Sequence, residues 1–213
     1  MRTILGHNER ITSDKDRIFI HIRALFLREG FNKISMDEIA SGLKVSKKTI
    51  YKHFPSKEFI ITAIVEGLMK SLQGKLEEII NSDADSVEKM IKLYQLIGQF
   101  LLDVNDKWIN DLRIHQPLLW EKVDEFRTNK LNKSFSSIIE KGKSEKLIKD
   151  YTVNLLVLLL TSSLRGVINN EFLLRSRFSY HDAIETSLEV LFNGILTDKG
   201  QKIFNKKITE GLK

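Results

Sequence analysis

The spacing of apolar residues predicts a series of helices between about residue 13 and residue 196. The clearest segment lies between residues 13 and 30, where apolar side chains recur at one face of a helix: Ile18, Phe19, Ile22, Leu25 and Phe26. Ser13 can cap the start of this helix, and Gly30 suits the left-handed conformation that closes one. Few segments alternate with period two, and the chain holds only two prolines. The pattern therefore predicts an all-α fold.

Two short helices follow, each with its own start signal. Ser35-Met36-Asp37-Glu38 is a capping box, and the helix it opens extends to about Leu43. Ser46 caps the next helix, which must end before Pro55, because the residue before a proline is driven out of the helical region. Two short helices separated by about three residues form the arrangement of a helix-turn-helix.

The remaining helices are longer and belong to a helical body. They are expected from Ser56 to about Ile80, from Ser86 to about Val104, from Asp106 to Pro117, and from Leu118 to about Gly142. Lys143–Tyr151 is predicted as a polar link, followed by apolar helices over about 152–172 and 180–196 and by a polar tail. Residues 155–160 are apolar nearly all round their helix, so this helix should be covered on more than one side.

Charge changes the interpretation of the N-terminal part. The whole chain carries a net charge of +6, and residues 1–60 hold twelve Lys and Arg against seven Asp and Glu. The body is therefore almost neutral, and the basic excess lies in the segment with the two short helices. A basic module of this kind favours a polyanionic partner, although many solvated surfaces are mildly basic as well.

The second short helix has the composition expected of a major-groove reader. The groove admits one helix, whose first residues face the base edges while its flanks meet phosphates. Val45, Ile50 and Phe54 are expected to anchor this helix to the preceding ones. Its outer face is then shared by Ser46, Lys47, Lys48, Thr49, Tyr51, Lys52 and His53. The alternative is a solvated helix hairpin that is rich in lysine by chance.

Residues 31–58 resemble the DNA-binding signature of the tetracycline-repressor (TetR) family. The matching positions are Phe31, Ser35, Ile39-Ala40, Val45-Ser46, Thr49-Ile50-Tyr51, His53-Phe54 and Ser56-Lys57. Two lysines, Lys44 and Lys48, stand where the family commonly has glycine. If Lys44 adopts a positive φ, the conformation costs about 1 kcal/mol relative to glycine.

The resemblance implies a DNA-binding transcriptional regulator that acts as a homodimer, is released from a palindromic operator by a small and largely apolar ligand, and needs no cofactor. A three-helix DNA-binding domain is expected over residues 1–55, and an effector-binding and dimerisation domain over 56–213. Ser35 and the start of its helix are expected to bind phosphate. Ser46, Lys47 and Thr49 are expected at base edges, Tyr51, His53 and Lys57 at phosphates, and Lys48 and Lys52 at either.

The resemblance also implies dimerisation through the helices at about 152–172 and 180–196, although a central helix buried within one chain explains the apolar pattern equally well. Candidate effector residues are large or polar side chains of the middle helices: Tyr94, Phe100, Trp108, Arg113, His115, Trp120, Phe135 and Phe172. They could equally be ordinary core. A DNA-binding architectural protein of the same fold without an effector is the alternative function.

Several other classes are disfavoured by the sequence. The chain has no cysteine, which excludes disulfides and thiolate chemistry. No catalytic constellation, Gly-rich phosphate loop or metal-binding spacing is present, so neither an enzyme nor a metal site is expected. The first ten residues lack the apolar core of a signal peptide, and no apolar run approaches the roughly 20 residues of a membrane span. We therefore expect a cytoplasmic protein.

Overall fold

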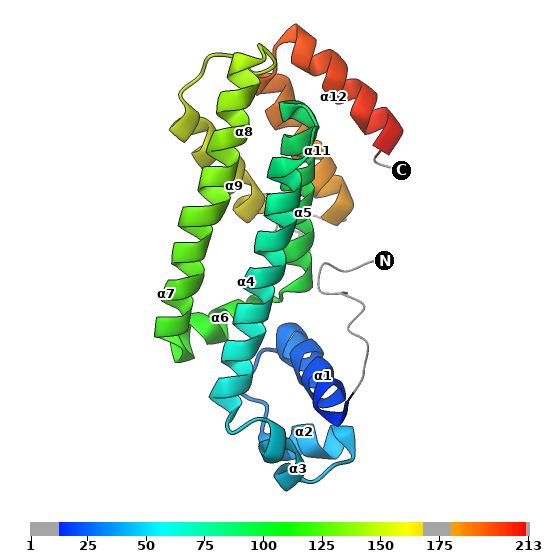
Figure 1. The fold of residues 1–213 in the computed structure, drawn as a ribbon, viewed down its shortest axis with the longest axis vertical. Coiled ribbons are helices and arrows are strands. Elements are labelled where there is room, and N and C mark those ends of the chain that lie inside the picture. Colours follow the sequence, from blue (N-terminus) through cyan, green and yellow to red (C-terminus); the bar gives the residue numbers. More distant parts are fainter. Residues whose placement is uncertain (1–12, 168–179, 212–213) are drawn as a thin grey trace. The chain divides into compact units, whose positions relative to one another are not determined.

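A computed structural model of the chain describes residues 13–167 and 180–211, and in these ranges the chain is all-α, as predicted (Figure 1). An isolated bridge joins Ile148 and Leu196. The helices are α1 (Asp14–Glu29), α2 (Met36–Leu43), α3 (Lys47–His53), α4 (Lys57–Asn81), α5 (Ser86–Asp103), α6 (Asp106–His115), α7 (Pro117–Phe126), the π-helix η1 (Arg127–Asn132), α8 (Lys133–Ser144), α9 (Val153–Val167), α11 (Tyr180–Ile195) and α12 (Asp198–Gly211).

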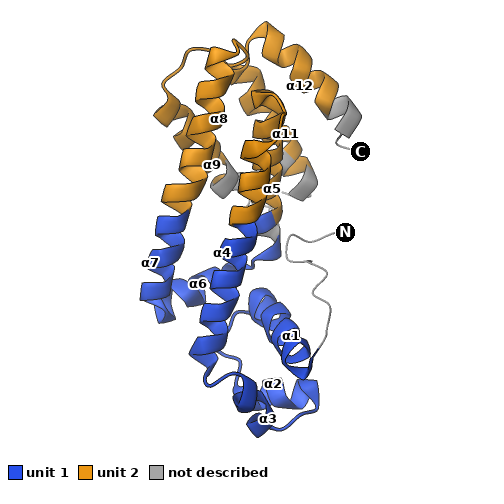
Figure 2. Cartoon of the chain, viewed as in Figure 1, with its two compact units in different colours: residues 1–72, 100–126 blue, residues 73–99, 127–213 orange. Residues whose placement is uncertain are grey.

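The chain divides into two compact units (Figure 2). Unit 1 comprises residues 1–72 and 100–126, and unit 2 comprises residues 73–99 and 127–213. Helices α4 and α5 contribute residues to both units, because each is cut by a unit boundary. The predicted division at residue 55 concerns function and remains a prediction.

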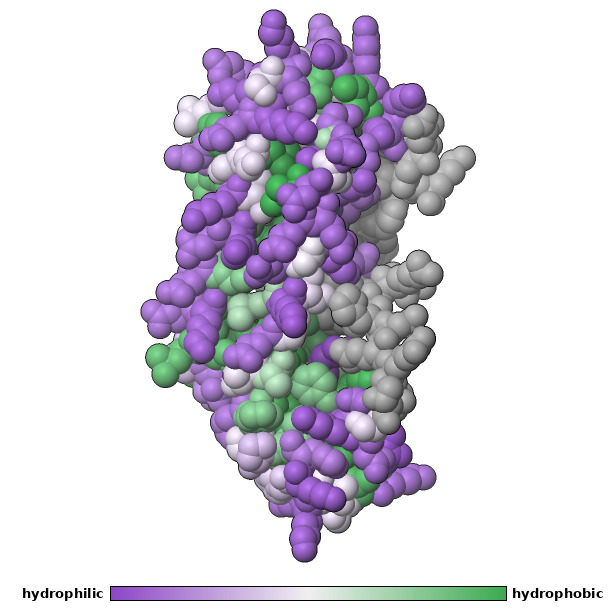
Figure 3. Space-filling view, in the orientation of Figure 1, coloured by the Kyte–Doolittle hydropathy of each residue, from purple (hydrophilic) through white to green (hydrophobic). Residues whose placement is uncertain are grey.

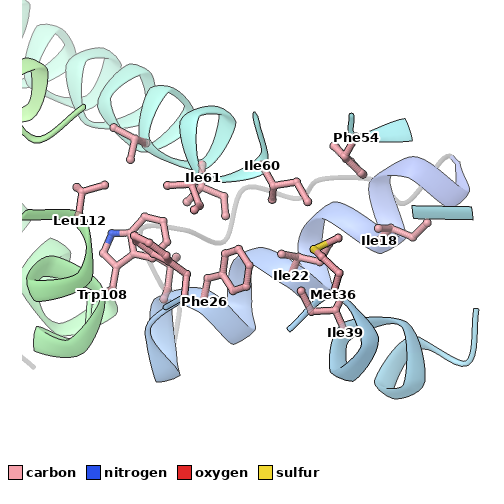
Figure 4. Packing of buried hydrophobic residues seen from close by; sticks show 14 of the residues in the cluster. Ile18, Ile22, Phe26, Met36, Ile39, Phe54, Ile60, Ile61, Trp108 and Leu112 are labelled. Atoms are coloured by element: carbon pink, nitrogen blue, oxygen red, sulfur yellow. The ribbon is translucent and has the colours of Figure 1, made fainter. Parts of the chain in front are cut away.

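The core of unit 1 joins α1, α2, α3 and the first turns of α4 to α6 and α7. Ile22 and Phe26 of α1 are fully buried, and Trp108 of α6 lies among the same apolar side chains (Figure 4). The Trp108 ring centroid lies 6.4 Å from that of Phe26 and 5.2 Å from that of Phe31. Since each fully buried side chain of this size contributes about 1.5–3 kcal/mol, α6 is an integral part of the module that holds α2 and α3.

Unit 2 has a separate core, in which α12 takes part. The Phe192 ring packs edge-on against Tyr94, with the ring centroids 6.2 Å apart, and at a tilt against Phe204, with the centroids 5.1 Å apart. Phe204 belongs to α12 and is buried. The predicted polar tail is therefore wrong for residues 198–211, which form a helix. The sequence pattern missed it because α12 buries a narrow stripe beneath a largely polar surface.

Helix α5 begins at Ser86, as predicted, and the side chain of Asp85 caps it by accepting from the Glu88 amide at 2.9 Å. Two further segments differ from the predictions. The helix expected from Leu118 begins at Pro117 and is interrupted by η1. The expected polar link after it contains the buried Leu147 and Ile148. These differences arise from long-range packing, which local sequence signals do not contain.

Among the described residues, no helix is long and apolar enough to cross a membrane. In the same part of the chain, no group of three or more His, Asp or Glu side chains is arranged to hold a metal ion. On the face of the molecule drawn in Figure 3, hydrophilic side chains predominate and the apolar patches between them are smaller.

Candidate nucleic-acid interface

The start of α2 is closed by the predicted capping box. The Ser35 hydroxyl accepts from the Glu38 amide at 3.2 Å, and the Ser35 amide donates to Glu38 Oε2 at 2.6 Å. The hydrogen bond from the Ser35 backbone amide lowers the pKa of Glu38. Both polar groups of Ser35 are thus used within the helix start, which fixes where α2 begins.

The turn between α2 and α3 is a Schellman motif built on a lysine. Lys44 has φ 56° and ψ 40°, the left-handed conformation. Its amide donates to Ser41 O at 3.1 Å, and the Val45 amide donates to Ala40 O at 3.0 Å. The sequence left open whether Lys44 has a positive φ; it does, so the turn bears the cost of about 1 kcal/mol that a glycine would avoid.

Helix α3 is held from one side and open on the other. Ser46 caps it by accepting from the Thr49 amide at 3.0 Å, and the two hydroxyls lie 2.8 Å apart. Ile50 and Phe54 are buried, as expected of anchors, and the Phe54 ring stacks on Phe19 at 5.9 Å. Of the predicted contact residues, Ser46, Lys47, Lys48, Tyr51 and Lys52 are exposed, while Thr49 and His53 are half-buried.

Two of the predicted lysines have protein partners that sequence reasoning did not foresee. The Lys47 ammonium lies 2.7 Å from Asp37 Oδ2, and the hydrogen bond with that carboxylate raises the pKa of Lys47. The Lys57 ammonium donates to Ile34 O at 2.6 Å and lies 5.8 Å from the centre of the Phe26 ring. Burial lowers the pKa of Lys57. The spacing of residues in the sequence does not predict either contact, because each joins residues of different helices or turns.

Residues 21–64, which contain this helix pair, match the family model described as "Bacterial regulatory proteins, tetR family". The chain is 30% identical over 158 residues to the biofilm operon icaADBC HTH-type negative transcriptional regulator IcaR of Staphylococcus aureus (strain Newman), covering 70% of this chain and 81% of that protein. The chain belongs to the TetR family. It is accordingly a DNA-binding transcriptional regulator and not an enzyme.

Similarity extends beyond the DNA-binding region. The uncharacterized HTH-type transcriptional regulator YvaF of Bacillus subtilis (strain 168) is 26% identical over 189 residues, covering 86% of this chain and 96% of that protein. A putative transcriptional regulator from Saccharomonospora viridis, crystallised in complex with choline, has a similar fold, with a TM-score of 0.70 and 18% identity over 86% of this chain and 97% of that chain.

The candidate effector residues of this TetR-family chain do not all lie in one unit. Trp108 is buried in the core of unit 1, and Phe100 and Trp120 pack against that core. Tyr94 and Phe135 are fully buried in unit 2. Arg113 and His115 are exposed on α6, and Phe172 lies outside the described residues. For Trp108 the contacts with Phe26 and Phe31 are those of an ordinary core residue.

Tyr94 is the one candidate in unit 2 with a polar group inside an apolar core. Its hydroxyl lies 3.3 Å from Ser163 Oγ, and burial raises the pKa of Tyr94. Ser163 in turn donates to Leu160 O at 2.9 Å. Ser187 is a second hydrogen-bond partner of the Tyr94 hydroxyl, so this buried polar group is bonded to side chains of both α9 and α11.

Apolar side chains remain uncovered on α9 and α11. Leu155, Leu158 and Leu159 are exposed to 51%, 60% and 48%, and Val190 to 65%. In contrast, Leu156 and Leu160 of α9 and Phe192 of α11 are buried within unit 2. The described residues of one chain therefore cover only part of the apolar surface of α9.

Proposed function

We propose that this TetR-family regulator is a cytoplasmic homodimeric repressor that binds a palindromic operator and is released by a small, largely apolar ligand. The DNA-binding part of the proposal rests on the exposed, basic outer face of α3, a helix that the buried Ile50 and Phe54 anchor to the core of unit 1. The similarity to IcaR, named as a negative regulator, supports repression.

In the proposed complex, α3 lies in the major groove. Ser46, Lys47 and Thr49 meet base edges, Tyr51 and His53 meet phosphates, and Lys48 and Lys52 flank the groove. The ordinary helix geometry leaves the first amides of α2 without helical acceptors, and an anion is favoured there. Lys57 holds its ammonium at Ile34 O, beside this helix start. The two remaining N–H groups of Lys57 are available to the same phosphate.

Dimerisation supplies the second half-site. The exposed Leu155, Leu158 and Leu159 on α9 and Val190 on α11 favour a second copy of the chain as the group that covers them. Each protomer then contributes one α3, and the two half-sites lie about 34–36 Å apart, one turn of the DNA helix. In this proposal residues 1–55 bind DNA, and residues 56–213 dimerise and respond to the ligand.

The effector site is proposed in the helical body, with Tyr94 as a polar group that orients the ligand. The complex of the Saccharomonospora viridis neighbour with choline supports a small-molecule site in a protein of this fold. A ligand that binds better to one arrangement of the two protomers shifts the population toward it, and a changed half-site spacing lowers operator affinity.

The DNA-binding part is tested with the duplex upstream of the chain's own coding sequence. Equilibrium binding is measured over a range of salt for wild type, Lys47→Ala and Tyr51→Phe, with Lys122→Ala as the control, since Lys122 is an exposed lysine on α7. We expect both α3 variants, and not Lys122→Ala, to weaken binding or to reduce its salt dependence. If both bind as wild type does at every salt concentration, α3 is not the DNA-binding helix.

The effector part is tested by thermal unfolding against a library of small apolar compounds. We expect a compound that raises the melting temperature and also weakens operator binding, because a ligand that binds only the folded state stabilises it. If no compound stabilises the protein, the alternative of an effector-free DNA-binding protein of the same fold is favoured.

A further inference from the structure

The turn between α1 and α2 is held by a carboxylate from a helix far along the chain. Asp111 of α6 accepts two backbone hydrogen bonds on the same oxygen, Oδ2, from the Phe31 amide at 2.7 Å and the Asn32 amide at 2.8 Å. The two partners are separated from Asp111 by about 80 residues of sequence. Hydrogen bonds to an ionised acceptor are roughly twice as strong as neutral ones, so this is a firm attachment point.

The backbone before the turn has the shape that the carboxylate requires. Gly30 has a φ of +79°, which L side chains rarely adopt. A Cβ at this position would lie 2.5 Å from Asp111 Oδ2 and 3.3 Å from Lys107 Cβ. The absence of a side chain at residue 30 therefore allows the oxygen of Asp111 to approach the two amides.

Other contacts hold α6 against the end of α1 in the same register. The Asn105 amide donates to Leu27 O at 3.1 Å. The Trp108 ring meets Phe31 edge-on, and Figure 4 shows Trp108 of α6 beside Phe26 of α1, with Leu112 next to Trp108. The exposed pair Lys107–Glu29, at 3.4 Å, adds little to this contact because water screens it.

The turn held by Asp111 leads directly to the start of α2. The Ile34 amide donates to Phe31 O at 3.3 Å, and Ile34 O accepts from Lys57 of α4. Ser35, the next residue, is the cap of α2. Displacement of Phe31 and Asn32 would therefore move the origin of α2, and with it the short turn to α3.

We propose that Asp111 is a positioning residue for DNA binding: its carboxylate fixes the α1–α2 turn on α6 and thereby sets the placement of α2 and α3. Asp111 touches no DNA in this account, so it acts on affinity by keeping the helix pair in its binding geometry. The proposal rests on DNA binding through α3 and is independent of dimerisation and of any effector.

The test uses the full chain and a duplex selected by wild type from a random pool. Asp111→Ala removes both acceptor contacts, Asp111→Asn keeps an acceptor oxygen without the charge, and Lys107→Ala is the matched control on the same helix. Loss of a hydrogen bond to a charged group shifts the population away from the positioned turn by about tenfold or more. Because only molecules with the positioned turn bind tightly in this account, we expect Asp111→Ala to bind DNA at least about tenfold more weakly. Asp111→Asn is expected to lose about threefold, and Lys107→Ala less than about twofold.

Two readouts separate positioning from a lost DNA contact or a lost fold. The slope of log affinity against log salt should be unchanged in Asp111→Ala, since no phosphate contact is removed. Amide hydrogen exchange should accelerate at Phe31 and Asn32 while the core of α4 stays protected. If Asp111→Ala does not fold, Asp111→Asn decides by the same measurements.

The proposal is overturned if the folded alanine variant binds the selected duplex like wild type, or if its salt slope falls. If only the asparagine variant folds, the proposal is overturned when that variant binds the duplex as tightly as wild type does. Failure of the wild-type protein to select any duplex would count against the proposed function itself, and it is recognised before any variant is compared.

Discussion

The Lys47 ammonium lies 2.7 Å from Asp37 Oδ2, so the first residue of α3 is ion-paired with the first turn of α2. Both side chains are exposed, and the pair therefore contributes little to folding. The ion pair matters instead for the binding of DNA by Lys47. In the proposed complex, the Asp37 carboxylate competes with a DNA phosphate or a base edge for the Lys47 ammonium.

Asp37→Asn is accordingly expected to strengthen binding to DNA of unrelated sequence, by about two- to fivefold at low salt, because it removes a negative charge and frees Lys47. Fluorescence anisotropy with a non-operator duplex at two salt concentrations measures this. Asp106→Asn, at the exposed start of α6, removes the same charge away from α3. Equal gains in the two variants would show that only net charge matters.

The capping box of α2 gives a pH-dependent prediction. The pKa of Glu38 is lowered in the folded state, so its contribution to stability is present above the ordinary carboxyl range and is lost as pH falls through the lowered pKa. Urea unfolding should therefore show wild type more stable than Glu38→Gln at pH 7, with a smaller difference at pH 3. In a Ser35→Ala background the effect of Glu38→Gln should shrink only in part at pH 7, because the backbone amide of residue 35 still donates to Glu38. A difference independent of pH would rule out this role of the carboxylate.

Two glycines should respond in opposite directions to the same substitution. Gly30→Ala should destabilise the chain by about 1–3 kcal/mol, because it forces a side chain into a positive φ and against Asp111. Gly67→Ala, in α4 and with nothing within 4 Å of the added Cβ, should stabilise it by about 0.5–1 kcal/mol. Urea midpoints measure both. Equal effects at the two positions would mean that the close approach at Gly30 is absent in solution.

The helix-turn-helix could be predicted from the sequence because its signals are local. Ser35 and Glu38 lie three residues apart, and Pro55 acts on its own neighbour, so their structural outcome depends on few other residues. The attachment of the same module to α6 could not be predicted, because Asp111 resembles any exposed acid of a helix. Its role arises only when the fold brings it to Phe31 and Asn32.

The helical body was harder to predict for the same reason. The buried Phe204 of α12 packs against Phe192, which belongs to another helix. Aromatic spacing also did not reveal that Trp108 and Tyr94 are both buried, in the cores of different units.

The contribution of α12 to stability is testable directly. Phe204→Ala should cost about 3–5 kcal/mol, the usual range for removing a buried phenylalanine. Phe59→Ala, which changes a ring that is 49% exposed, is the matched comparison and should cost less. Chemical denaturation of both variants provides the values. Equal small losses would mean that residues 198–211 behave as a dispensable tail.

The proposed dimer surface distinguishes two exposed leucines. Leu158→Glu on α9 should dissociate the dimer, because a charge would be buried against the second copy. Leu118→Glu on α7, where the leucine is 78% exposed, should leave it intact. Sedimentation velocity of the two variants and wild type reports the assembly state. Dissociation by Leu118→Glu alone would locate the interface elsewhere.

The central claim, that the outer face of α3 reads DNA sequence, is tested most directly by base substitution. Wild type and Lys47→Ala are compared on a selected duplex and on every single base-pair change within one half-site. We predict that Lys47→Ala loses about 1–3 kcal/mol of discrimination at one or two positions and retains it at the others. Unchanged discrimination at every position would contradict the claim.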